Sequence, residues 1–188
     1  MAGFAAAIPF LAVVCTTLKN GVAMSLVVFM VLIPAAFLCF ALRCRLNVPP
    51  WPTALLCTLV SLIIATLSTY VIRIIAPEIT DSLGIYLYLT AAFGVVAAVF
   101  RGREVRSPGN AGLWALQYAG VFALCAVFIS AVREILAYGQ IWGMPLGMSY
   151  ILEGAKMPFF GFILAGLLLA FSKYIRRMAY IHRHMFED

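Results

Sequence analysis

The residues whose side chains could do chemistry in this chain are few. The two histidines, His182 and His184, follow the last apolar stretch of the sequence. A haem in the membrane needs axial ligands within or near the apolar stretches, so a bis-histidine haem held by this chain is excluded. A solvated tail is favoured over a metal site at these histidines, because side chains two residues apart on a helix point in different directions.

Acidic residues would be needed for a second kind of chemistry, a relay of protons or cations. Such a relay places carboxylates inside the membrane-spanning stretches. The carboxylates here lie instead at segment ends or in loops, as with Glu78, Asp81, Glu134 and Glu153. A coupled ion would therefore use backbone carbonyls of interrupted helices, partner subunits, or hydroxyl groups such as those of Thr16, Thr17 and Thr90.

Arg133 and Glu134 form the most prominent charged pair, at the end of the fifth apolar stretch. We expect this pair to lie at the membrane interface, where the arginine extends its charged group towards water and forms a local ion pair. A role in an ion path is the alternative. The sequence offers no nucleophile–base pair, phosphate-binding loop or dinucleotide fingerprint, so catalysis by this chain alone is not expected.

Cysteines could supply thiolates or disulfides, and five are present: Cys15, Cys39, Cys44, Cys57 and Cys125. None forms a C-x-x-C pair, and all except Cys44 lie inside apolar stretches. The pattern favours small buried apolar side chains over metal ligands or disulfides.

Six apolar stretches must position these residues. The chain has 188 residues, of which 65% are hydrophobic and 11% charged, so lipid must be its solvent. Four stretches approach the length of about 20 residues that crosses a bilayer core, namely 22–42, 51–72, 113–132 and 157–175. The first and fourth stretches, 4–18 and 84–100, are shorter and contain Pro9 and Gly94.

Short, interrupted stretches at matching places in two halves are typical of an inverted repeat with a site near the membrane midplane. The sequence thus predicts an all-α integral membrane protein with six transmembrane segments in a 3+3 inverted-topology repeat. The whole chain, residues 1–188, is expected to form one polytopic domain, with half-repeats at about 1–75 and 76–175 and a tail at 176–188. The predicted connections include a tight turn at 19–21, a polar turn at 76–82 and a long loop at 133–157.

The basic residues predict the orientation of the segments. The formal net charge is +6, and nine of the thirteen Lys and Arg residues fall on the side that holds both termini. The positive-inside rule therefore places both termini in the cytoplasm. The excess of basic residues is explained by topology, so a nucleic-acid partner is not expected.

Three patches resemble the paired membrane subunits of the Rnf and Nqr complexes, the RnfA/RnfE–NqrD/NqrE family. Residues 133–136, followed by Gly139 and then 143–147, resemble a stretch of the RnfE/NqrD branch. Residues 82–87 resemble the start of the family's fourth segment, and residues 9–13 resemble part of its first segment. With six segments in register, the resemblance covers nearly the whole chain. It implies a multi-pass protein of the cytoplasmic (inner) membrane of a bacterium or archaeon.

The resemblance implies a pairing of two homologous six-segment subunits of opposite topology. Their first and fourth half-helices would meet near the membrane centre, where each subunit supplies two cysteines to a [2Fe–2S] cluster. This sequence departs from that pattern, because the ligand positions carry Ile8 and Gly94. A possible half-helix pathway would be lined by Pro9, Thr90, Phe93 and Gly94.

The resemblance therefore implies a divergent integral subunit of an ion-translocating electron-transport complex that scaffolds its homologous partner and has lost the ligand role. No cofactor is expected on this chain alone, and flavins and iron–sulfur clusters are expected on partner subunits. Two alternatives stay open: a stand-alone inverted-repeat transporter of a small solute or ion, and a membrane anchor of another redox assembly. The electron donor, the electron acceptor and the ion are not determined by the sequence.

Overall fold

The computed structural model describes residues 12–45, 49–90, 92, 108–145, 147 and 151–184. Its long helices are α3 (Leu18–Arg45), α4 (Pro50–Ile75), α8 (Pro108–Tyr138) and α9 (Pro158–His184). The short elements are α5 (Pro77–Leu83), α6 (Ile85–Leu89), a two-stranded hairpin of β1 (Gln140–Ile141) and β2 (Met144–Pro145), and the 3-10 helix η1 (Glu153–Lys156).

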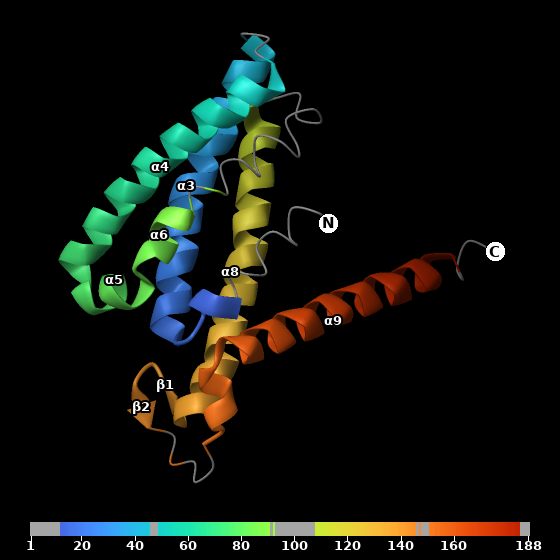
Figure 1. Cartoon of the computed structure of the whole chain (residues 1–188). Coiled ribbons are helices and arrows are strands. Elements are labelled where there is room, and N and C mark those ends of the chain that lie inside the picture. Colours follow the sequence, from blue (N-terminus) through green and yellow to red (C-terminus); the bar gives the residue numbers. More distant parts are fainter. Residues whose placement is uncertain are drawn as a thin grey trace.

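Helices α3 and α8 lie side by side and form the centre of the molecule, and α4 packs on the other side of α3 (Figure 1). The buried core comes mainly from these two central helices and is built from small and branched apolar side chains. Small residues allow helix backbones to approach closely in a membrane. At Gly21, a Cβ would overlap the Ser130 side chain, so the absence of a side chain permits the α3–α8 crossing.

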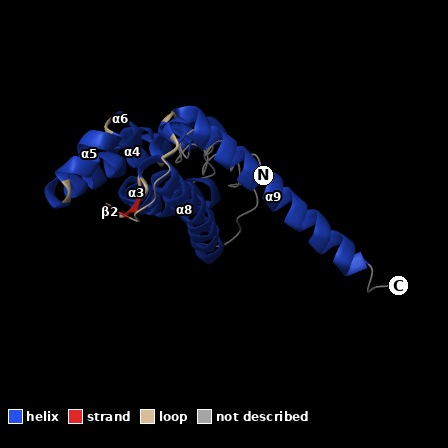
Figure 2. Ribbon diagram, turned by 90° about the horizontal axis from the view of Figure 1, so that it is seen from below, coloured by secondary structure: helices blue, strands red, loops and turns tan. Residues whose placement is uncertain are grey.

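Three described helices are long and apolar enough to cross a membrane, over Leu18–Leu42, Trp51–Ile75 and Gly109–Tyr138. The apolar part of α9, Pro158–Tyr174, is shorter. Helix α9 extends away from the lower end of α8, with its C-terminal end far from the central helices (Figures 1 and 2). The architecture is that of an all-α membrane protein, as predicted.

Helix α8 continues past the predicted end of the fifth segment to Tyr138, so Arg133 and Glu134 lie in its last two turns. The helix ends at Gly139, whose φ of 61° and N–H bond to the Ile135 carbonyl at 2.9 Å form a left-handed C-terminal cap. The predicted loop at 133–157 is therefore wrong at its start. Its described part contains the β1–β2 hairpin and η1.

Two predicted turns are also helical. Residues 19–21 lie inside α3, and the interruption falls instead at residues 15–17, after helical residues 12–14. Residues 77–83 form α5, which begins with Pro77 at its first turn and has Glu78 beside it, both of which favour a helix start. Most of the predicted first and fourth segments, including Ile8, Pro9, Phe93 and Gly94, lies outside the described residues.

Candidate functional site

Arg133, on α8, is 1% exposed and lies between the backbone of residues 12–15 and that of residues 155–157. Its Nη1 donates to the carbonyl oxygens of Ala12 at 2.8 Å and Cys15 at 3.1 Å. Its Nε and Nη2 donate to the carbonyls of Ala155, Lys156 and Met157, each at 3.3 Å. A guanidinium has five N–H donors, and the five bonds to backbone carbonyls engage all of them.

These carbonyls belong to two chain segments that end in the same place. Ala12 belongs to the described helical residues 12–14 and Cys15 directly follows them, while Ala155 and Lys156 end η1 and Met157 directly follows it. The last carbonyls of a helix have no partner within it and carry partial negative charge. The positive charge of Arg133 therefore stabilises both helix ends at once, from a third helix.

Glu134 binds the opposite kind of helix end. Its Oε2 accepts from the backbone N–H of Leu18 at 2.5 Å, and its Oε1 accepts from the N–H of Gly143 at 3.2 Å. Leu18 is the first residue of α3, where N–H groups have no partner within the helix and a negative charge is favourable. Glu134 thus caps α3 from α8 and ties the hairpin turn to the same point.

Arg133 and Glu134 together hold the interruption at residues 15–17 from both sides. The arginine binds the helical end before it, and the glutamate binds the helical start after it. Neighbouring residues on a helix project in different directions, which lets one pair serve two helix ends. We call this arrangement the Arg133–Glu134 clamp.

The local sequence also favours the interruption that the clamp holds. The Thr17 hydroxyl accepts from the Asn20 N–H at 3.4 Å, the geometry of an N-terminal cap. The Asn20 amide donates to the Thr16 hydroxyl at 3.1 Å, and its oxygen accepts from the Ser82 hydroxyl at 2.9 Å. The bond to Ser82 fastens the start of α3 to α5, and the bond from Leu18 to Glu134 fastens it to α8.

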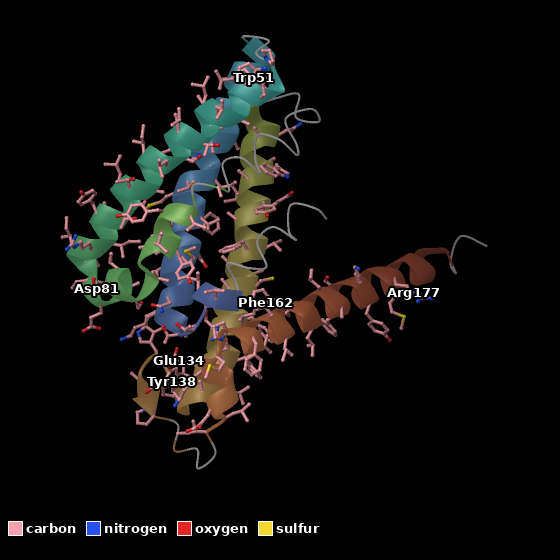
Figure 3. The ribbon with its side chains drawn as sticks, viewed as in Figure 1. Trp51, Asp81, Glu134, Tyr138, Phe162 and Arg177 are labelled. Atoms are coloured by element: carbon pink, nitrogen blue, oxygen red, sulfur yellow. The ribbon has the colours of Figure 1, made fainter. Side chains whose placement is uncertain are left out.

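Helix α9 approaches the clamp through a glycine. A Cβ on Gly161 would overlap the backbone of Ala12, including the carbonyl oxygen that Arg133 binds. The contact brings α9, α8 and the first described helical piece to one point. Figure 3 shows Glu134 and Phe162 near the junction of α8, α9 and the hairpin, with Trp51 at the far end of the molecule.

The exposed, ion-paired arrangement predicted for Arg133 and Glu134 is wrong. Arg133 is 1% and Glu134 is 2% exposed, and among the described residues both side chains bond to backbone groups instead of forming an ion pair with each other. Burial of a charge is costly unless its hydrogen-bonding groups are engaged, and the clamp meets that condition. The sequence signal for this role was an Arg-Glu pair close to the end of an apolar segment.

The other residues predicted for the site fall in different places. Thr90 is fully buried, and its hydroxyl donates to the Leu87 carbonyl at 2.5 Å, which engages it with its own helix end. Pro9, Phe93 and Gly94 lie outside the described residues. The structure therefore brings Arg133 and Glu134 to the first helix interruption and does not test the predicted half-helix pathway.

The structure describes the side chains of three cysteines, which are buried or half-buried. Cys15 and Cys57 are buried, Cys125 is half-buried, and none of these three thiols forms a disulfide. Within the described ranges, no group of three or more His, Cys, Asp or Glu side chains could hold a metal ion. The side chains of Cys39 and Cys44 are outside this description.

The three long apolar helices define the chain as a polytopic α-helical membrane protein. The sequence model of one family, described as "Rnf-Nqr subunit, membrane protein", matches residues 1–170. The chain therefore belongs to the Rnf-Nqr subunit family. Comparison with individually curated proteins gives no match.

Proposed function

We propose that this chain is an integral membrane subunit of an ion-translocating electron-transport complex of the Rnf/Nqr type. The family match over residues 1–170 and the apolar helices support membership of such a complex. Its partners would be a homologous six-segment subunit of opposite topology and subunits that carry flavins and iron–sulfur clusters. Both termini would lie in the cytoplasm, because most basic residues fall on that side.

The observation that carries the proposed role is the Arg133–Glu134 clamp. It fixes the end of the first helical piece against α3, α8 and η1 through backbone bonds. Interrupted helices in membrane transport proteins place their free backbone groups at functional crossings. The subunit would therefore act as a scaffold that presents the first half-helix to its partner in a fixed position.

The sequence departs from the family's [2Fe–2S] ligand pattern, because Ile8 and Gly94 stand where the resemblance implies cysteines. Such clusters are held by four cysteine thiolates. Cys15 is fully buried beside the clamp, and it lies seven positions after Ile8, where the resemblance implies a family ligand. We therefore propose that this chain supplies no ligand to a shared cluster, and no electron-transfer step is assigned to it.

Purification of the chain from native membranes in mild detergent tests the proposal. Mass spectrometry is expected to identify a homologous six-segment subunit together with flavin- and iron–sulfur-binding subunits. Recovery of this chain alone, or only with copies of itself, would overturn the proposal in favour of a stand-alone transporter. Recovery with soluble catalytic subunits of another type would instead indicate a membrane anchor.

Spectroscopy of the same preparation tests the lost ligand role. A sample prepared without oxygen from a Cys15→Ala variant is expected to give the same iron–sulfur signals as the unmodified complex. A signal that disappears only in this variant would contradict the proposal. The Cys125→Ala variant is the matched control, because Cys125 is also a free thiol but lies on the central helix α8.

A further inference from the structure

The β1–β2 hairpin carries an aromatic residue in an unfavourable backbone conformation. Its strands are joined by Trp142 and Gly143, with Ile141 paired to Met144. Trp142 has a φ of 57° and Gly143 a φ of 84°. Positive φ at both central residues is the pattern of a type I′ turn, in which Asn, Asp or Gly is favoured at the first position. Trp142 is the only non-glycine residue with positive φ in the described part of the chain.

Two hydrogen bonds to α8 hold this turn and the chain that returns from it. Glu134 accepts the N–H of Gly143 at 3.2 Å, and the same carboxylate is fixed at its other oxygen by the N–H of Leu18. The chain that returns from the hairpin is bound as well, since the Leu152 N–H donates to the Leu136 carbonyl at 2.8 Å. A strained residue persists only where its surroundings determine the conformation, and such residues are often functional.

The held turn and the chain that follows it carry exposed apolar side chains. Among the described residues between α8 and α9, the exposed large apolar side chains are Ile141, Trp142, Met144, Ile151, Leu152 and Met157, which we call the hairpin patch. Met144 is 72% and Trp142 is 48% exposed. Residues 139–147 contain no charged side chain. If the hairpin faced bulk water, the apolar side chains of the hairpin patch would be in contact with water.

The hairpin directly follows the end of α8, and this indicates how deep the hairpin lies relative to the bilayer. The candidate membrane span ends at Tyr138, and β1 begins at Gln140. Figure 3 shows Tyr138 beside the hairpin at this end of α8. The Lys156 ammonium lies 5.6 Å from the centre of the Tyr138 ring. Aromatic rings and lysines that reach towards headgroups are typical of the boundary between lipid and water.

We propose that the hairpin patch inserts into the boundary between the lipid headgroups and the acyl chains, with Trp142 as its anchor. The occupant of the surface is the bilayer, because the patch continues directly from a membrane span and lies next to an aromatic–lysine pair typical of that depth. Glu134 thereby connects the lipid boundary to the helix interruption. The inference requires only a membrane protein and does not depend on the proposed function.

A nitroxide spin label at the hairpin measures its surroundings in the full chain, within whatever assembly it purifies. The label is attached to a Met144→Cys variant in which the five native cysteines are replaced, and the protein is reconstituted in phospholipid nanodiscs. Molecular oxygen is enriched among acyl chains, whereas a nickel chelate is enriched in water. The label on Met144→Cys is expected to collide with oxygen several-fold more often than with the chelate. A label on Glu153→Cys, an exposed position in η1, is the water-facing control.

Two results would overturn the proposal. Preferential collision with the nickel chelate would place the patch in water, and low collision with both reagents would place it under a protein partner. A second variant, Trp142→Gly, keeps a residue that suits the turn and removes the anchor. In that background the label is expected to gain access to the chelate by several-fold, and unchanged access would contradict the anchoring role of Trp142.

Discussion

Replacement of Arg133 by methionine removes all five guanidinium donors and keeps a long, flexible side chain at the position. The two shortest bonds, to the carbonyls of Ala12 at 2.8 Å and Cys15 at 3.1 Å, hold the helical piece before α3. A hydrogen bond to a charged group contributes about 1.5–3 kcal/mol. Loss of these two bonds alone should therefore destabilise the closed helix interruption by about 3–6 kcal/mol.

The thiol of Cys15 reports this opening directly, because it is fully buried beside the interruption. In a chain whose other four cysteines are replaced, a small thiol reagent can reach Cys15 only when the region opens. Every 1.4 kcal/mol changes an equilibrium tenfold, so Arg133→Met should speed the labelling of Cys15 by roughly 10²- to 10⁴-fold. The measurement is the labelling rate in mild detergent, followed by mass spectrometry.

Two further variants separate the clamp from a general effect of charge. Arg73→Met removes an exposed arginine from the last turn of α4, at the same end of the molecule, and should leave the labelling rate unchanged. Arg133→Lys keeps the charge but not the planar group with five donors, so its rate should fall between those of wild type and Arg133→Met. Equal labelling rates in Arg133→Met and wild type would refute the clamp.

The remaining predictions concern other contacts of the clamp and use the free energy of unfolding in mixed detergent micelles. Glu134→Gln replaces one carboxylate oxygen, an acceptor, with an amide group that donates towards a backbone N–H. This variant should lower the free energy of unfolding by about 1.5–3 kcal/mol. The control variant Glu153→Gln, at an exposed position, should have little effect. Gly161→Ala introduces a methyl group against the backbone of Ala12 and should cost about 1–3 kcal/mol. Gly166→Ala, on the same helix with nothing near its Cβ position, is the matched control, and equal losses in the two variants would contradict the proposed close contact.

The apolar pattern of the sequence predicted the helical membrane class, because uninterrupted apolar stretches must form helices in lipid. It predicted the ends of those helices less well. The N-terminal cap by Thr17 and the first-turn proline at residue 77 are local signals that place helix starts correctly. The sequence nevertheless predicted turns at 19–21 and 76–82, because the glycine and polar residues there are equally typical of turns.

The clamp could not be predicted from spacing because its partners are distant in sequence. Arg133 bonds to Ala12 and Cys15 across 121 and 118 positions, and Glu134 bonds to Leu18 across 116. A charged pair near the end of an apolar stretch fits interfacial exposure as well as burial. Only the packing of α3 against α8 brings unpaired backbone groups within reach of both side chains.

The same separation has a consequence for synthesis of the protein. The carbonyl of Ala12 leaves the ribosome 121 residues before the arginine that binds it. At about 5–20 residues per second, this interval is on the order of ten seconds. During that time the first helical piece and the start of α3 have entered the membrane without their caps from α8. A nascent chain that stops before α8 therefore has exposed backbone groups at this interruption, which is where the insertion machinery and membrane quality control would distinguish unfinished chains from complete ones.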